Sequence, residues 1–468
     1  MRKLVGLILL VWAIGSPVFG SSISNVAGTI SNGNSITVYG TGFGTTGPTV
    51  VLFDDFERGT VGDYLRFALP QIGQWHLQKN SPLYASDFVR SGTRSLAVSQ
   101  YTFNDLGRWC GNTGTPPSNP EDEGGCDNVE PGSSRYQSFA IDFQTLTPSG
   151  ETDEIYFEYS YYIPPGNTYP GGDHNFKTDW LLGTRTDAAN DWRFLGGGGL
   201  LNLPNANGEM EGGFGSNSGF PELETCGTPP RNMYPWGYVF ISPVNRWGRV
   251  MNYAFSSTGC SGEIWHAQIP FPSVTTLGFR CDSVSHCVGG TNSGGVCTGH
   301  DLCPGGYCDY QDGYADRNTC QMVRKHRTGH TTFNAGSYEG YARLGFNAYA
   351  RNEADPGNHY YWRYDDVYVA IGSGARARVE ISSTRTWGDP AYSSTIDMMV
   401  CTPTSWSASA VSCTYRSGGF SPGQTAYVFV VDADGNISDQ DTGTVGYQGY
   451  QITIGGTASG PTRRTDIR

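Results

Sequence analysis

Residues 360–371 (YYWRYDDVYVAI) consist largely of aromatic and β-branched residues and contain neither Gly nor Pro. These residue types favour extended backbone, so the run predicts a β-strand. Residues 50–57 (VVLFDDFE) have the same mixture of acidic and aromatic residues near the other end of the chain. Each run contains two adjacent aspartates, Asp54-Asp55 in one and Asp365-Asp366 in the other.

The opening "FDDFE" and the closing "YDDVYV" resemble the first and last strands of a concanavalin A-like jelly roll. In that fold the two strands lie close together. The resemblance therefore implies that residues 50–372 form one closed β-sandwich.

The composition supports an all-β protein with many turns and long loops. Gly accounts for 65 of 468 residues, about twice the usual share, and only 16% of residues are charged. Long stretches of helical periodicity are hard to find, which also favours strands. The net charge of −13 argues against nucleic acid as a general partner, because phosphate binding requires a basic surface.

The N-terminal 20 residues are typical of a secretory signal. Arg2 and Lys3 precede an apolar run over residues 4–14, and a cleavage site is expected near Ser21. The run is too short to span a bilayer, and no second apolar run follows it. We therefore expect a secreted protein, extracellular or periplasmic, without a membrane span. The oligomeric state is left open.

Twelve cysteines follow the signal, and an even number in an exported chain indicates disulfides. Pairing between cysteines that are close in the sequence predicts the disulfides Cys110–Cys126, Cys226–Cys260 and Cys401–Cys413. The other six lie in residues 281–320, a stretch poor in aliphatic residues that we interpret as a disulfide-stapled insertion. A zinc site around Cys303 and Cys308 is the alternative, although the spacing of these cysteines does not match the usual zinc motifs.

Residues 23–44 (ISNVAGTISNGNSITVYGTGFG) contain one alternating strand, residues 35–39, between glycine turns. They resemble the opening of an IPT/TIG immunoglobulin-like domain, and residues 405–438 resemble its later strands. The resemblance implies that residues 21–49 and 373–456 form one Ig-like sandwich into which the jelly roll is inserted, followed by a tail, 457–468. A separate C-terminal β domain beside an N-terminal edge strand is the alternative. Neither terminal piece could bury a core alone, which favours the insertion.

The clearest alternating strand of the chain covers residues 339–352. Its small and apolar side chains are expected to face inward. Its opposite face is rich in Arg and Tyr, a composition that is typical of ligand binding. The inward set is Ala342, Leu344, Phe346, Ala348 and Ala350, and the outward set is Tyr341, Arg343, Gly345, Asn347, Tyr349 and Arg351.

A tyrosine-rich strand, residues 154–163, is followed by a Gly-rich loop and by "NFK" at residues 175–177. This order resembles alginate- and glucuronan-lyase-type jelly-roll polysaccharide lyases. The resemblance implies β-elimination on a uronate polymer or cell-surface glycan, with a base, an acid and a group that neutralises the carboxylate. The expected catalytic residues are Lys177, His174, Tyr341 and Tyr349, and the expected substrate-binding residues are Arg343, Asn347, Arg351 and Glu158.

No cofactor is required by this chemistry. Asp365 and Asp366 are expected to be structural or to help hold a structural calcium ion. Asp432 to Asn436 (DADGN) also suggests calcium, but strands on both sides favour a hairpin turn.

Other interpretations remain open at this stage. Lys177 could pair with Asp179 or Glu158 across a strand, and Tyr341 and Tyr349 could stack on a sugar without doing chemistry. Glu209 and Glu211 could instead serve a jelly-roll glycoside hydrolase, or lie in a surface turn. The non-enzymatic alternative is a lectin-like adhesin or another extracellular surface protein.

Overall fold

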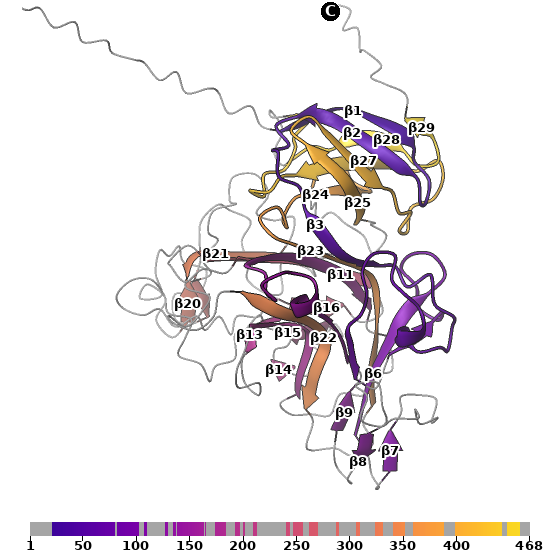
Figure 1. Cartoon of the computed structure of the whole chain (residues 1–468), viewed down its shortest axis with the longest axis vertical. Helices are drawn as coiled ribbons and strands as arrows, with labels where there is room; N and C mark the ends of the chain where they lie inside the picture. The colour runs from indigo at the N-terminus through magenta and orange to yellow at the C-terminus, as the bar shows by residue number, and fades with distance from the viewer. Residues whose placement is uncertain are drawn as a thin grey trace, which may run out of the picture.

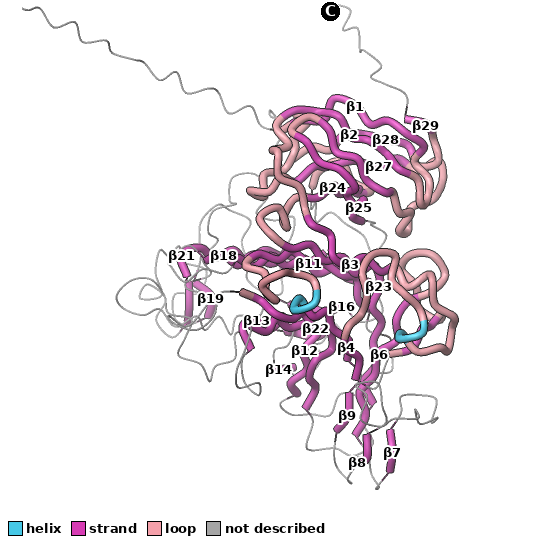
Figure 2. Tube along the Cα trace, in the orientation of Figure 1, coloured by secondary structure: helices cyan, strands magenta, loops and turns pink. Residues whose placement is uncertain are grey.

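The computed structural model (Figure 1) describes residues 21–79, 82–102, 107–109, 127–129, 134–136, 138–162, 164, 174–183, 192–196, 200–201, 209–212, 240–243, 247–255, 262–269, 287–289, 306–308, 323–330, 340–351, 359–387, 398–441 and 447–458. Within these ranges the regular structure is β, apart from two short 3₁₀ turns, η1 (Leu65–Phe67) and η2 (Phe143–Thr145). The all-β fold class is thus confirmed. The strands form two stacked bodies, and Figure 2 shows how few other elements accompany them.

The upper body in Figure 1, the terminal sandwich, contains strands from both ends of the chain. Its strands are β1 (Ser22–Thr29), β2 (Ser35–Thr41), β24 (Arg378–Ser382), β25 (Met398–Ser407), β26 (Ala410–Thr414), β27 (Thr425–Val431), β28 (Tyr450–Thr453) and β29 (Thr457–Ala458). They are hydrogen-bonded in the order β28-β27-β24-β25-β26-β2-β1-β29. The first half of β25 pairs with β24 and the second half with β26, so this strand passes from one layer to the other.

The lower body, the central sandwich, consists of a large and a small sheet. The large sheet contains β3 (Thr49–Asp54), β5 (Leu83–Ala85), β6 (Ser95–Thr102), β9 (Ser134–Tyr136), β11 (Glu154–Tyr162), β17 (Trp247–Phe255), β18 (Gly262–Ile269), β21 (Val323–His330) and β23 (His359–Ile371). The small sheet contains β4 (Leu77–Lys79), β10 (Ser138–Asp142), β12 (His174–Gly183), β13 (Trp192–Gly196), β14 (Leu200–Leu201) and β22 (Tyr341–Arg351). Three further pairs are β7 (Gly107–Trp109) with β8 (Asp127–Val129), β15 (Glu209–Gly212) with β16 (Phe240–Pro243), and β19 (Cys287–Gly289) with β20 (Gly306–Cys308).

The two aspartate-bearing strands are neighbours, as predicted. β3 pairs antiparallel with β23, with Asp54 opposite Val367. Both carboxylate oxygens of Asp54 accept buried hydrogen bonds, from the backbone N–H of Phe56 at 2.9 Å and from the indole N–H of Trp75 at 2.7 Å. The acidic residues of this run are therefore part of the framework that closes the large sheet.

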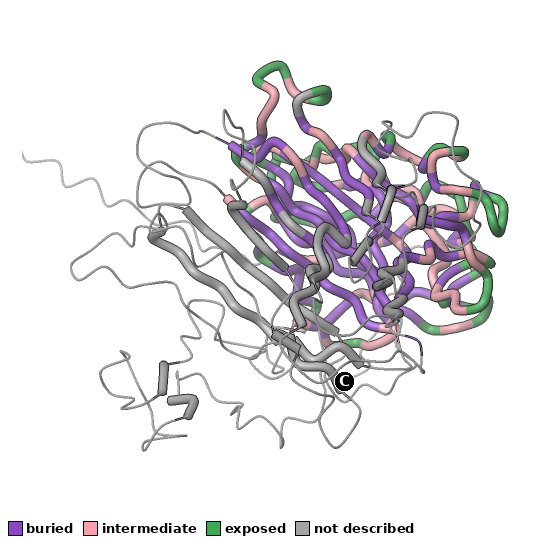
Figure 3. The backbone as a smooth tube through the Cα atoms, turned by 90° about the horizontal axis from the view of Figure 1, so that it is seen from below, coloured by how far each residue is buried: buried purple, intermediate pink, exposed green. Residues whose placement is uncertain are grey.

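Alternation along β11 divides its side chains between two cores. Figure 3 shows buried strands running side by side, with the exposed residues in the loops around them. Phe157 and Tyr159 face the small sheet and pack with Phe346, whose ring centroid lies 5.4 Å from that of Tyr159. Tyr156 faces the other way and joins a cluster with Met398 and Phe429 of the terminal sandwich. The large sheet is consequently covered on both faces.

The two chain segments that connect the sandwiches run past each other at a close approach. A Cβ atom on Gly374 would lie 2.1 Å from the backbone oxygen of Gly47, so only glycine fits there. The segments that enter and leave the central sandwich therefore lie side by side at this point.

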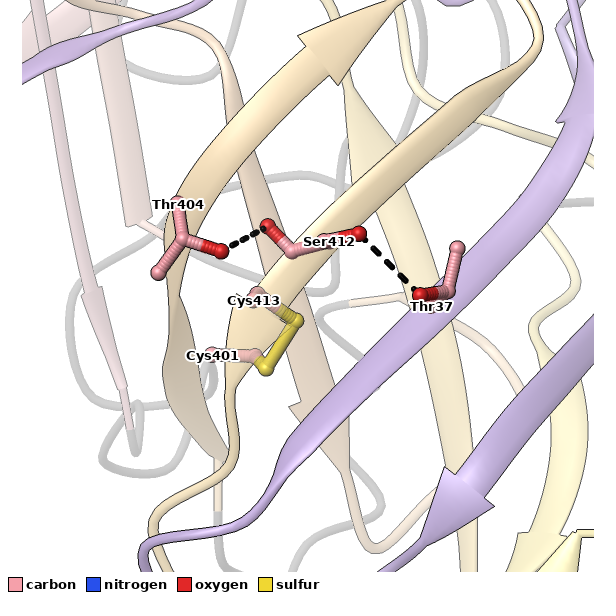
Figure 4. The surroundings of a disulfide bond; sticks show 5 residues. All are labelled: Thr37, Cys401, Thr404, Ser412 and Cys413. Atoms are coloured by element: carbon pink, nitrogen blue, oxygen red, sulfur yellow. Dashed lines mark hydrogen bonds between the residues drawn. A yellow bond between two sulfur atoms is a disulfide. The ribbon is translucent and has the colours of Figure 1, made fainter.

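One of the predicted disulfides lies within the described residues and is confirmed. Cys401 and Cys413 are bonded across β25 and β26, with Cα atoms 5.5 Å apart (Figure 4). The predicted pairs Cys110–Cys126 and Cys226–Cys260 lie outside the described residues.

The turn after β27 confirms the hairpin interpretation of the Asp-Gly run. Asn436 donates its backbone N–H to Asp432 Oδ1 at 2.8 Å, and Gly435 has a φ of 82°. Among the helices of the described residues, none is long and apolar enough to cross a membrane.

Candidate functional site

The register between β12 and β22 brings several predicted site residues together. Lys177 lies directly opposite Tyr349, and Asn175 lies opposite Arg351. His174 is the next residue on β12 and is paired with Leu201 of β14. Directly opposed residues in an antiparallel pair have Cβ atoms about 4.5–5.5 Å apart. Lys177, Tyr349 and Arg351 therefore occupy one small patch of the small sheet, whereas His174, three residues from Lys177, lies on the other face of β12.

The pairing of these strands is irregular between Lys177 and Asp179, which face Tyr349 and Phe346 respectively. Two residues of β22, Asn347 and Ala348, thus stand against one residue of β12. A bulge of this kind interrupts the alternation of faces along a strand. The predicted outward set of β22 therefore does not continue as one uninterrupted face.

The expectation that Tyr341 faces outward is wrong. Its side chain is 2% exposed and belongs to the core between the two sheets. A second register irregularity, between Leu182 and Gly183 opposite this end of β22, breaks the alternation here too. Tyr341 also exchanges backbone hydrogen bonds with Thr152, at 2.7 and 2.9 Å. A tyrosine sealed in the core in this way cannot reach a polymeric substrate.

Leu344 and Phe346 are fully buried, which confirms their predicted inward orientation. Arg343 lies on the opposite face and is partly exposed. Its guanidinium forms an ion pair with Asp142 of β10 at 3.1 Å. Arg343 is opposite Leu182, five residues along β12 from Lys177, or about 17 Å at ~3.4 Å per residue. Arg343 and the Lys177–Tyr349 pair therefore cannot act on the same sugar carboxylate.

A histidine that sequence analysis did not predict lies beside this ion pair. The Nδ1 atom of His76 accepts the backbone N–H of Asp142 at 3.1 Å, and its Nε2 atom lies 3.0 Å from the hydroxyl of Thr145. Burial lowers the pKa of His76. A neutral ring held by two partners fixes the end of β10 and η2, and thereby the carboxylate that pairs with Arg343.

Glu158 was predicted to bind substrate, and the structure contradicts this. Its side chain is 2% exposed, on the face of the large sheet that meets the terminal sandwich. Glu158 forms an ion pair with Arg249 and accepts the hydroxyl of Tyr156 at 2.7 Å. The interpretation of Glu158 as a partner for Lys177 fails for the same reason. Asp179, the other proposed partner, is fully buried and accepts the hydroxyl of Tyr159.

Asp365 and Asp366 have structural roles in the described residues. Asp365 Oδ2 accepts the backbone N–H groups of Arg90 and Ser91 at 3.0 and 3.1 Å, tying a loop to β23. Asp366 has a φ of 50° and accepts the Ser91 hydroxyl at 2.8 Å. Within the ranges that the structure describes, no group of three His, Cys, Asp or Glu side chains could hold a metal ion.

The residues of the glycosidase alternative are on another sheet. Glu209 and Glu211 are on β15, opposite Pro243 and Ile241 of β16. This pair of strands is a separate two-stranded sheet rather than part of the small sheet.

No protein-family model matches the sequence, and no curated protein matches it significantly. Among solved structures, the chain is similar to the marine PL-14 alginate lyase from Aplysia kurodai, with 10% identity and a TM-score of 0.31 over 64% of this chain and 90% of that one. An endo-β-1,4-glucuronan lyase from Trichoderma reesei has 10% identity and a TM-score of 0.32, covering 69% and 96%. A cellulose-induced protein has 13% identity and a TM-score of 0.28, covering 68% and 96%. Scores this low leave family and function to be argued from the chain's own residues.

Proposed function

We propose that the protein recognises an extracellular polysaccharide and cleaves a uronate-containing polymer by β-elimination at the patch around Lys177 and Tyr349. The observation that carries the proposal is the direct opposition of these two residues on adjacent strands. Both residues are among the catalytic residues expected from the sequence. Side chains of directly opposed residues on paired strands are close enough to reach the same sugar unit.

The chemistry requires three functions around one uronate. A base removes the proton from C5, the C4–O bond breaks as the C4=C5 double bond forms, and an acid returns a proton to the departing oxygen. We assign both proton transfers to Tyr349, which takes the C5 proton as phenolate and returns it to the leaving oxygen; His174, three residues from Lys177, belongs to the opposite face of β12. Lys177 supplies positive potential, which favours the phenolate form of a neighbouring tyrosine and stabilises negative charge at the carboxylate.

The substrate carboxylate must be neutralised before the C5 proton becomes acidic. Arg351 is the best-placed candidate, because it lies two residues from Tyr349 on β22 and opposite Asn175. Asn347 lies on the other side of Tyr349, at the register irregularity. Arg343 is assigned instead to a more distant part of the bound polymer. Local positive charge from Lys177 and Arg351 offsets the overall charge of −13 near an anionic chain.

The remaining expectations accompany this proposal. We propose that residues 1–20 direct the chain out of the cytoplasm and that it acts outside the cell or in the periplasm. A structural calcium ion in the central sandwich is proposed as a support for the fold and not as part of the chemistry. Thermal unfolding with and without a chelator tests it, and an unchanged midpoint would exclude it.

The test of function is incubation with alginate and with glucuronan. A lyase produces unsaturated uronate ends, which absorb in the ultraviolet, at the same rate as new reducing ends. New reducing ends without ultraviolet absorbance would indicate a glycoside hydrolase. Retained binding without either product would leave a lectin-like adhesin, and neither binding nor product would reject the proposal.

A further inference from the structure

One exposed face of the terminal sandwich lacks charged side chains. It is formed by the outward residues of β2, β26 and the second half of β25, and we call it the hydroxyl face. Ser412 of β26 lies between Thr37 of β2 and Ser405 of β25, which gives a row of three hydroxyl residues across three strands. Ser35 and Thr414 form a second row beside it. The residues between them, such as Ile36 and Cys413, point into the core.

The lack of charge extends over both segments that build the face. Residues 21–53 and 398–415 contain no Asp, Glu, Lys or Arg, although the chain has 43 acidic and 30 basic residues. A solvent-exposed surface normally mixes both signs of charge, which keeps the protein soluble. Loss of charged residues is instead typical of the centre of an interface. The hydroxyl face therefore has the composition of a surface that is covered by a partner.

The hydroxyl groups of this face are held in place. Thr37 and Ser412 are hydrogen-bonded at 3.0 Å, and Thr404 donates to the backbone oxygen of Ser412 at 3.2 Å (Figure 4). The disulfide between Cys401 and Cys413 links β25 to β26 on the core side. Paired strands lie about 4.8 Å apart, so the face offers regularly spaced hydroxyl groups that need little ordering on binding.

Tyr39 adds an aromatic ring to the same face. It follows Thr37 by two residues on β2, so it projects on the same side, and its side chain is 42% exposed. Tyr39 is opposite Ala410, a residue with a small side chain. Aromatic rings stack on the apolar faces of sugar rings, and nearby hydroxyl groups can exchange hydrogen bonds with the sugar's own.

The size of the face limits what can bind to it. Three strands about 4.8 Å apart and about 17 Å long cover on the order of 250 Å². A stable contact with a second protein copy requires roughly 800 Å² on each side. The area fits an extended ligand of small footprint better than a second copy of the chain.

We propose that the hydroxyl face is a binding site for a neutral polysaccharide, separate from the site at Lys177 and Tyr349. The ligand is uncharged because no cation on the face could neutralise a carboxylate. The site holds the protein on a neutral glycan, whereas the small sheet is proposed to act on an anionic one. The inference does not depend on lyase activity.

The experiment measures depletion of the full-length protein from solution by microcrystalline cellulose and by chitin, two insoluble neutral polysaccharides. The parent is expected to bind at least one of them. Tyr39→Ala is expected to weaken that binding about tenfold, the loss of one well-placed aromatic contact. Ser405→Glu, which places a charge in the first hydroxyl row, is expected to weaken it by a similar factor.

Gln451→Glu is the matched control, because it adds the same charge at an exposed position of β28, outside the hydroxyl face. It is expected to bind as the parent does, and equal melting temperatures would show that all variants are folded. Failure of the parent to bind either polymer, or binding as tight as the parent's by both Tyr39→Ala and Ser405→Glu, would overturn the proposal. A parent dimer in sedimentation that Ser405→Glu dissociates would also overturn it, in favour of self-association. Activity on alginate and glucuronan, measured separately, distinguishes this failure from failure of the lyase proposal.

Discussion

Glu158 and Arg249 form an ion pair inside the contact between the two sandwiches, where both side chains are at most 5% exposed. Arg249 also donates to the backbone oxygen of Met398, the first residue of β25, and Arg90 donates to the same oxygen at 3.0 Å. Two arginines of the central sandwich therefore hold one strand of the terminal sandwich. A second buried pair, Arg378 with Glu380, lies on the other side of the contact.

Breaking the Glu158–Arg249 pair should be severely destabilising. Arg249→Met leaves the Glu158 carboxylate buried, with the hydroxyl of Tyr156 still donating to it, and loss of one member of a buried pair costs about 3–5 kcal/mol. Urea unfolding measures the change in free energy. Arg385→Ala is the control, because its pair with Asp441 is 4.0 Å long and well exposed. Equal losses for the two variants would contradict the structural role of the buried pair.

The same contact predicts that the two sandwiches unfold together. The cluster between them is apolar as well as ionic and includes Tyr156 and Phe429. Separate unfolding would expose this surface before either core opens, which is unfavourable. We expect fluorescence and far-ultraviolet circular dichroism to report one coincident transition. Two resolved transitions in the parent would show that the contact is weak.

Asp54 should make the protein less stable as the pH rises. Burial raises its pKa to about 7, from an ordinary value of 3.8. The folded state therefore keeps a proton that the unfolded chain releases, and the stabilisation present below about pH 4 is lost as the pH rises to about 7. A shift of this size corresponds to about 4 kcal/mol at most. Burial also raises the pKa of neighbouring Asp55, to about 6, which adds to the trend.

Unfolding free energies between pH 5 and pH 8 test this dependence. Asp54→Asn removes the titrating proton but keeps an oxygen that can accept from the Trp75 indole. We expect a shallower decline of stability with pH in this variant than in the parent. An unchanged slope would mean that Asp54 titrates normally in the folded protein.

The disulfide between Cys401 and Cys413 should stabilise the terminal sandwich. The bond spans 12 residues of sequence, and cross-linking a loop of this length contributes about 3 kcal/mol in the chain-entropy model. A Cys401→Ala/Cys413→Ala double variant should lower the free energy of unfolding by a similar amount. Because the other cysteines are retained, the variant isolates this bond better than a reductant would. A loss below about 0.5 kcal/mol would contradict the expectation.

The strand content and the adjacency of β3 and β23 could be predicted because local patterns carry them. The acidic-aromatic runs around Asp54 and Asp365 marked the two strands. Glu158 was misplaced because the alternation of a strand identifies which residues share a face but not what covers that face. Here the terminal sandwich covers the face of β11 that carries Glu158.

The errors on β22 have a different physical cause. Regular alternation assumes an uninterrupted strand, and the register of this one is irregular at two places. The irregularity between Leu182 and Gly183 lies opposite Tyr341, and the one between Lys177 and Asp179 lies opposite Asn347 and Ala348. The β-propensity of either strand does not reveal such a bulge, because a bulge depends on how the two strands pair. The Lys177–Tyr349 pairing could likewise be found only from the register.

Tyr349 and Tyr341 provide the sharpest test of the proposed active site, because the same substitution should act on each in a different way. Tyr349→Phe removes the proposed proton-transfer group, so kcat on the cleaved uronate polymer should fall about 10²–10⁴-fold. Tyr341→Phe alters only a core residue, 2% exposed, and should change stability while leaving kcat within about twofold. Arg351→Ala should lower kcat through loss of carboxylate neutralisation, whereas Arg343→Ala, about 17 Å away, should mainly raise KM. Equal activity of Tyr349→Phe and Tyr341→Phe would remove the chemistry from the Lys177–Tyr349 pair and leave that patch as a binding surface alone.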